Sequence, residues 1–77
     1  MTVIDNTSVH EIAKWRRKGH GIWCFLFKVD GYDEDFVMRE PGRLTEDFAL
    51  KLAKGKLAKA LKVNRRHVVH TQTVKEP

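Results

Sequence analysis

The side chains in this sequence that are best suited to chemistry are cations, and they form two groups. The larger group lies between residues 51 and 66, and the smaller group lies between residues 16 and 18. Lysine and arginine both bind phosphate, and the planar guanidinium of arginine can donate two parallel hydrogen bonds to it. These cations form the candidate nucleic-acid-binding set: Arg16, Arg17, Lys18, Lys51, Lys54, Lys59, Lys62, Arg65 and Arg66.

The net charge of +5 is distributed unevenly along the chain. Residues 30–47 carry seven acidic and two basic side chains, whereas residues 48–77 carry eight basic side chains and one acidic side chain. Such a distribution attracts an anionic partner to one side of a molecule and repels it from another. Seven phosphate contacts to duplex DNA would give a slope of about −6 when log affinity is plotted against log salt. The alternative is a helix whose exposed lysines serve only solubility.

The histidine and cysteine residues do not follow the spacing of a metal site. His20 and Cys24 are four residues apart on one expected strand, about 13 Å, which is too far for both to bind one ion. His67 and His70 point to opposite faces of another expected strand. The sequence lacks a glycine-rich phosphate loop and a G-x-S-x-G motif, and a cysteine among apolar neighbours is unreactive. We therefore expect no metal, no cofactor and no enzymatic activity.

The chain length and the apolar segments predict one cytoplasmic domain over residues 1–77. A chain of 77 residues supports one small core. Its longest uninterrupted apolar run, Ile22–Phe27, has six residues, whereas a membrane-spanning helix needs about 20. The apolar stripe of residues 51–62 is narrow and rich in alanine, which argues against a helix on a membrane surface, so we expect no membrane contact. The first residues lack the basic region and long apolar stretch of a signal peptide, and a single cysteine fits a reducing compartment.

Residues Ile22–Val29 predict a strand that is apolar on both faces. Asp30-Gly31 follows and is typical of a two-residue type I′ turn, in which both central residues need positive φ. This turn pairs the strand with residues 32–40 so that partner numbers sum to 61, which places Phe25 opposite Phe36. One face of the predicted hairpin is then largely aromatic.

Two helices are predicted from their capping residues. Ser8-Val9-His10-Glu11 fits the S-x-x-E capping box and predicts a helix over residues 9–18, with a strand as the alternative. Thr45 precedes a longer helix with acidic residues in its first turn, and Asn64 is typical of a left-handed residue that ends a helix. Gly55, inside this longer helix, indicates a bend or a close packing contact.

The succession of these elements predicts an α+β domain of the form helix-strand-strand-helix-strand. Residues 67–74 are β-branched and form the third strand. A helical crossover makes this strand parallel to the second and antiparallel to the first. The expected sheet is three-stranded and antiparallel, with order 2-1-3 and Ile22–Val29 at its centre. The long helix packs on the aromatic face and the short helix covers part of the other face; a stacking platform for single-stranded nucleic acid is the alternative use of the aromatic face.

Two functions are compatible with these observations. The first is a small nucleic-acid-binding or regulatory protein that contacts DNA or RNA phosphates through the long helix and the Arg65-Arg66 turn. The second is a protein-interaction module or homodimer that uses an open sheet face or an edge strand. We favour the first function, because the clustered cations are the strongest signal in the sequence.

Overall fold

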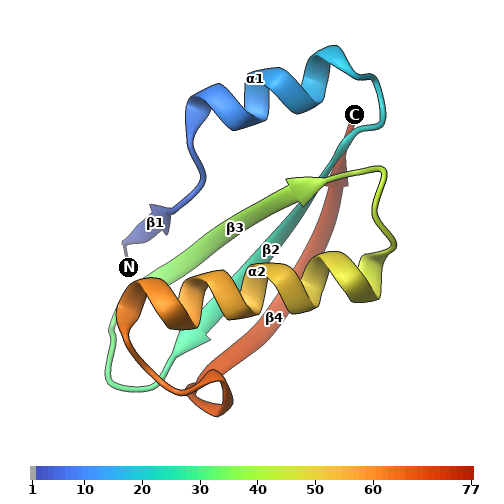
Figure 1. The fold of residues 1–77 in the computed structure, drawn as a ribbon. Coiled ribbons are helices and arrows are strands. Elements are labelled where there is room, and N and C mark those ends of the chain that lie inside the picture. Colours follow the sequence, from blue (N-terminus) through green and yellow to red (C-terminus); the bar gives the residue numbers. More distant parts are fainter. Residues whose placement is uncertain (1) are drawn as a thin grey trace.

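The chain folds into a four-stranded sheet with two α-helices and a short 3₁₀ helix, as shown by a computed structural model that describes residues 2–77 (Figure 1). The elements in chain order are β1 (Val3–Asp5), α1 (Val9–Arg17), β2 (Ile22–Val29), β3 (Asp35–Pro41), α2 (Glu46–Leu61), η1 (Arg65–His67) and β4 (Val68–Glu76). This result confirms the α+β class and the two predicted helices. Neither α-helix of the described chain is long and apolar enough to cross a membrane.

The sheet has the order β1-β3-β2-β4, with β2 antiparallel to both of its neighbours. The predicted central place of Ile22–Val29 is therefore confirmed. The predicted three-stranded antiparallel sheet is incomplete, because β1 adds a fourth strand parallel to β3 and makes the sheet mixed. β1 has only three residues, which is too short to show the alternation by which a strand is recognised in a sequence.

The predicted register of the β2–β3 hairpin is wrong by two residues. Phe25 lies opposite Met38 rather than Phe36, and the chain reverses through a loop over residues 30–34 instead of a two-residue turn. The ammonium of Lys28 lies 2.8 Å from the carboxylate of Asp35 at the base of this loop. A shift of two residues keeps every side chain on the same face of the sheet, so the apolar pattern fits both registers equally well.

Side-chain caps define the ends of the helices. Ser8 accepts a hydrogen bond from the backbone N–H of His10, and Thr45 accepts one from that of Phe48. The predicted left-handed terminator is wrong, because Lys62 takes that conformation (φ 57°) after α2. Asn64 instead accepts a hydrogen bond from the N–H of Arg66 and caps η1, a role for which its short side chain is well suited.

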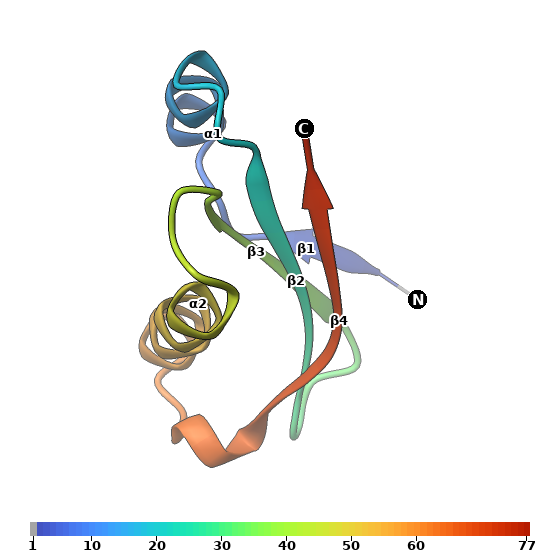
Figure 2. The same ribbon diagram turned by 90° about the vertical axis from the view of Figure 1, so that its right-hand side faces the viewer.

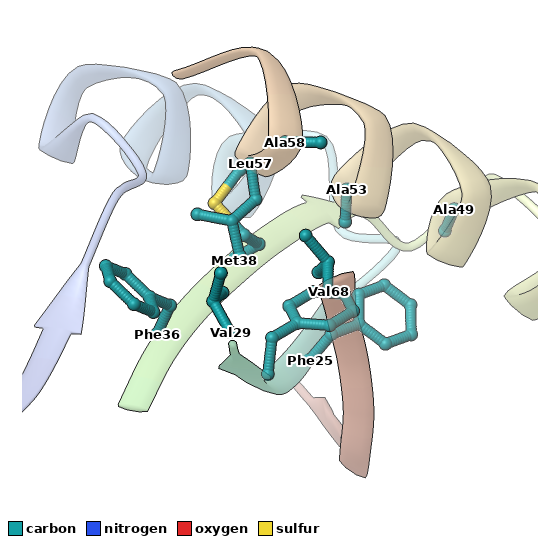
Figure 3. Packing of buried hydrophobic residues seen from close by; sticks show 10 residues of the cluster. Phe25, Val29, Phe36, Met38, Ala49, Ala53, Leu57, Ala58 and Val68 are labelled. Carbon is teal, nitrogen blue, oxygen red and sulfur yellow. The ribbon is translucent and has the colours of Figure 1, made fainter. Parts of the chain in front are cut away.

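The core lies between α2 and the aromatic face of the sheet (Figure 3). Phe25, Phe27 and Phe36 are almost completely buried there, beneath the alanine and leucine side chains of α2. The indole N–H of Trp23 donates to the carbonyl of Leu44 and closes one end of this core. Since α2 covers the aromatic rings, this face cannot stack nucleic-acid bases without unfolding.

The second face of the sheet is open except at one end, where Ile22 is fully buried. Figure 2 shows α1 and α2 on the same side of the sheet, with no helix of the described chain over the other side. The expectation that the short helix covers part of this face holds only at one corner, where Arg16 of α1 reaches Glu76 of β4 (3.6 Å). The strand that is apolar on both sides is therefore fully covered on one side only.

Candidate nucleic-acid interface

α2 packs on the sheet with one side and carries lysines on the rest of its surface. Ala49, Ala53 and Leu57 recur every four residues and are fully buried against the sheet. Ala58 is also buried, and the other positions of the helix and its cap are exposed to solvent to different degrees. The lysines predicted to bind phosphate there are Lys51, Lys59 and Lys62, which are exposed, and Lys54, which is half-buried.

Arg65 is fixed against the middle of α2. Its Nη2 donates a hydrogen bond of 2.8 Å to the backbone carbonyl of Lys51. A Cβ atom at Gly55 would lie only 3.0 Å from the same Nη2, so the guanidinium occupies the space that any larger residue would fill. This contact confirms the close packing predicted at Gly55 and explains why glycine is tolerated inside the helix despite its low helix propensity.

Two neighbouring hollows connect η1 to the lysines of α2. One has a volume of about 430 Å³ and is lined by Lys51, Lys54, Arg65 and Arg66 together with Leu50. The other has a volume of about 350 Å³ and shares Lys51 and Arg65 with the first. We define the α2–η1 basic surface by the six predicted cations of this region: Lys51, Lys54, Lys59, Lys62, Arg65 and Arg66.

The cations of the α2–η1 basic surface have no internal counter-ions. Within residues 2–77, none of these six side chains forms an ion pair. Other cations of the protein do: Lys56 pairs with Glu40, and Arg39 pairs with Asp5 and Glu76. The charge of the α2–η1 basic surface is thus neutralised only by solvent ions.

The other three predicted site residues lie at the far end of the molecule. Figures 1 and 2 place the end of α1 and η1, drawn in orange, at opposite ends. Arg16 pairs with Glu76, whereas Arg17 and Lys18 are exposed. Lys18 lines a small hollow with Lys14 and Arg43, two basic residues that were not predicted as site residues. Two adjoining hollows therefore group five of the nine predicted cations, Lys62 follows them at the end of α2, and the remaining three lie apart.

Glu40 is a notable residue that sequence reasoning missed. Its side chain is only 2% exposed, and burial raises the pKa of its carboxyl above the ordinary value, although the nearby ammonium of Lys56 acts in the opposite direction. Alternation along β3 contained the signal, because Glu40 follows Phe36 and Met38 at intervals of two residues and must share their buried face.

The cysteine and histidine side chains do not form a reactive group. Burial raises the pKa of the Cys24 thiol, which disfavours the nucleophilic thiolate. His67 lies 3.2 Å from Asp30, and His70 lies 2.6 Å from Thr73, at separate places in the structure. In residues 2–77, no three His, Cys, Asp or Glu side chains are arranged to hold a metal ion.

Comparisons of this chain with protein-family models, with curated proteins and with solved structures find no match.

Proposed function

We propose that the protein binds nucleic acid by contacting phosphates through the α2–η1 basic surface. The observation that supports this proposal is that the six cations of this surface form no ion pair within residues 2–77. A surface of this kind attracts mobile counter-ions. Nucleic-acid binding releases counter-ions from both the protein and the phosphates, and this release favours binding.

Arg65 is the best-placed phosphate ligand in the proposed interface. Its hydrogen bond to the carbonyl of Lys51 uses one of five guanidinium N–H groups, so most of its donors remain available. Because this contact already orders the side chain, binding costs less conformational entropy than with a mobile arginine. Contacts of this type position a duplex or single strand without reading its bases, and we expect weak sequence preference.

A regulatory role is part of this proposal, because a domain that covers phosphates competes with other proteins for the same site. We place this activity in the cytoplasm, where the unpaired thiol of Cys24 remains reduced.

The test is a titration of fluorescently labelled duplex DNA and RNA at several salt concentrations. Six phosphate contacts predict a log–log slope of about −5, which is about a thousandfold loss of affinity between 50 and 200 mM salt. Absence of binding at the lowest salt, or an affinity independent of salt, would contradict the proposal.

A second candidate function is self-association through the open face of the sheet. The pairing with β2 places Val69 (opposite Lys28) and Val74 (opposite Cys24) on this face, because a bulge between them offsets the alternation of β4. They are 49% and 46% exposed and lie near the half-buried Leu26 and Val37. The charged residues of this face nearly balance: Asp5, Lys28, Asp35, Arg39 and Glu76. A nearly neutral apolar face suits a second copy of the chain, whereas the α2–η1 basic surface would repel one.

Light scattering tests this second function. A dimer of the 9.0 kDa chain that dissociates when Val69 and Val74 are both replaced by lysine would support it. A monomer across all accessible concentrations would exclude it.

A further inference from the structure

A cleft separates α1 from α2 above β3 and has a volume of about 430 Å³. Its charged lining residues are Glu11 of α1, Arg39 and Glu40 of β3, and Lys56 of α2. Met38 and Leu61 contribute apolar surface beside them. The proposed nucleic-acid interface does not use this cleft, and the inference below does not depend on that interface.

Only one of the two carboxylate oxygens of Glu40, which lines the cleft, has a hydrogen-bond partner among the described residues. Its Oε1 accepts a hydrogen bond of 3.1 Å from the ammonium of Lys56. Its Oε2 is buried and has no hydrogen-bond partner among the described residues. Buried carboxylates normally have partners for both oxygens, and a titratable group that lacks one inside a cleft is a typical feature of a binding site.

Lys56 is a partner that can be displaced. Its side chain is 53% exposed, so the ammonium can leave Glu40 without disturbing the core. Lys56 also lines the neighbouring hollow that contains Lys51 and Lys59, which gives the flexible side chain a second position on the surface of α2.

The cleft has one more carboxylate than it has available cations. Glu11 faces Glu40 across the cleft, and the repulsion between them adds to burial in raising the pKa of Glu40. Arg39 lines the cleft too, but its guanidinium pairs with Asp5 and Glu76. Among the described residues that line the cleft, Lys56 is the one cation left to balance the two carboxylates.

We propose that this cleft binds a small organic cation with a primary amine or guanidinium group. The cation replaces Lys56 at the carboxylate of Glu40, gains attraction from Glu11, and lays a short apolar stem against Met38 and Leu61. An organic cation fits better than a metal ion because the described chain has no group of three or more His, Cys, Asp or Glu side chains that could hold one.

Agmatine, which has an amine at one end and a guanidinium at the other, is a suitable probe. We expect a titration of the ¹⁵N-labelled protein to show saturable amide shifts around Glu11, Glu40 and Lys56. N-butylurea has a similar shape without the charge and should produce no saturable shift. Affinity should rise as the pH increases through the pKa of Glu40, because only the ionised carboxylate attracts the cation.

Three variants make the test specific. Glu40→Gln should abolish the saturable shifts. Lys56→Met should increase the affinity severalfold, because the internal competitor is removed. Glu11→Gln, at an exposed position, should weaken binding severalfold and serves as the decisive variant if Glu40→Gln fails to fold.

Three results would overturn the proposal. The first is the absence of saturable shifts in the folded wild-type protein. The second is the same binding in the folded Glu40→Gln variant, or unchanged binding in Glu11→Gln. The third is a response centred on exposed carboxylates elsewhere, such as Asp33 or Glu46, which would indicate unspecific attraction of cations.

Discussion

The two ends of this molecule both carry clustered cations, but the cations have different environments. At the end of α1, Arg16 is paired with Glu76, and its neighbours Arg17 and Lys18 are exposed. Along α2 and η1, Arg65 is ordered by a backbone carbonyl, and Lys51, Lys54, Lys59 and Lys62 have no ion-pair partners in residues 2–77. From the sequence alone, the cations of the two groups cannot be distinguished. The comparison shows that the partners of a cation, rather than its presence, determine whether its charge is available to a ligand.

Charge reversal at each end of the molecule is the strongest test of the difference between the two cation groups. Arg65→Glu/Arg66→Glu should weaken nucleic-acid binding by about 100-fold near 50 mM salt, since two phosphate contacts and their counter-ion release are lost. The measurement is the fluorescence titration described above.

A matched control for this reversal exists at the other end of the protein. Arg17→Glu/Lys18→Glu changes the net charge by the same amount, and we expect an affinity within roughly threefold of wild type because only long-range, screened interactions change. Equal losses in both double variants would show that net charge alone drives binding and that α2–η1 is not a distinct interface.

Within α2, Lys59 and Lys56 allow a paired and an unpaired cation of the same helix to be compared. Lys59→Met should weaken binding roughly tenfold near 50 mM salt, because one phosphate contact is lost, and should leave stability almost unchanged. Lys56→Met should leave affinity almost unchanged and lower the free energy of unfolding by about 1–2 kcal/mol, because the buried Glu40 loses its hydrogen-bond partner.

Urea unfolding and the fluorescence titration, applied to both lysine variants, separate these effects. If Lys56→Met lost as much affinity as Lys59→Met, the distinction between paired and unpaired cations would not hold.

Gly55→Ala should have a smaller effect on binding and the opposite sign on stability. The added Cβ lies 3.0 Å from Nη2 of Arg65 and pushes the flexible guanidinium away from α2. We expect affinity to fall roughly threefold, because Arg65 loses its preset position. The free energy of unfolding should rise by up to about 1 kcal/mol, because alanine has a higher helix propensity than glycine.

The control for Gly55→Ala is the same substitution in an Arg65→Ala background. There it should stabilise the protein at least as much, because no arginine contact is displaced, and should have no further effect on binding. A loss of stability in the Arg65→Ala background would contradict the conclusion that Arg65 alone fills the space beside Gly55.

Glu40→Gln should have the smallest effect on nucleic-acid binding and should change the pH dependence of stability. The pKa of Glu40 is raised by burial in the folded protein, so the folded protein holds the proton more tightly than the unfolded chain does. The stability contributed by this proton is complete below the ordinary pKa of about 4.5 and is lost as the pH rises through the raised value. Urea unfolding of both proteins at several pH values measures this effect.

The result is read from the difference in unfolding free energy, wild type minus Glu40→Gln. This difference should decrease with rising pH across that window and then become constant. A difference that increases with pH would show that the pairing with Lys56 dominates over burial.

Local signals in the sequence were sufficient for most of the fold. Capping residues such as Ser8 and Thr45 predicted where the helices start, and the apolar run Ile22–Val29 predicted the central strand. Other features depend on information that is not local. The hairpin register was missed because a shift of two residues preserves both faces, and Val3–Asp5 is a strand only because β3 offers it an edge.

The candidate site was predictable as a list of residues but not as a surface. Helical spacing on α2 could group the lysines, whereas the position of Arg65 on Gly55 depends on how η1 returns along the helix. The pairing of Arg16 with Glu76 joins residues distant in the sequence and could not be foreseen. Glu40 could have been found, because its alternation with Phe36 and Met38 places a carboxylate on a buried face.

The most direct test of the central claim is an NMR titration of the ¹⁵N-labelled protein with a short DNA or RNA duplex at low salt. Binding through the α2–η1 basic surface predicts that the largest amide shifts fall in residues 51–66 and that added salt reverses them. Shifts concentrated at the end of α1 or on the open face of the sheet, or no shifts at all, would contradict it.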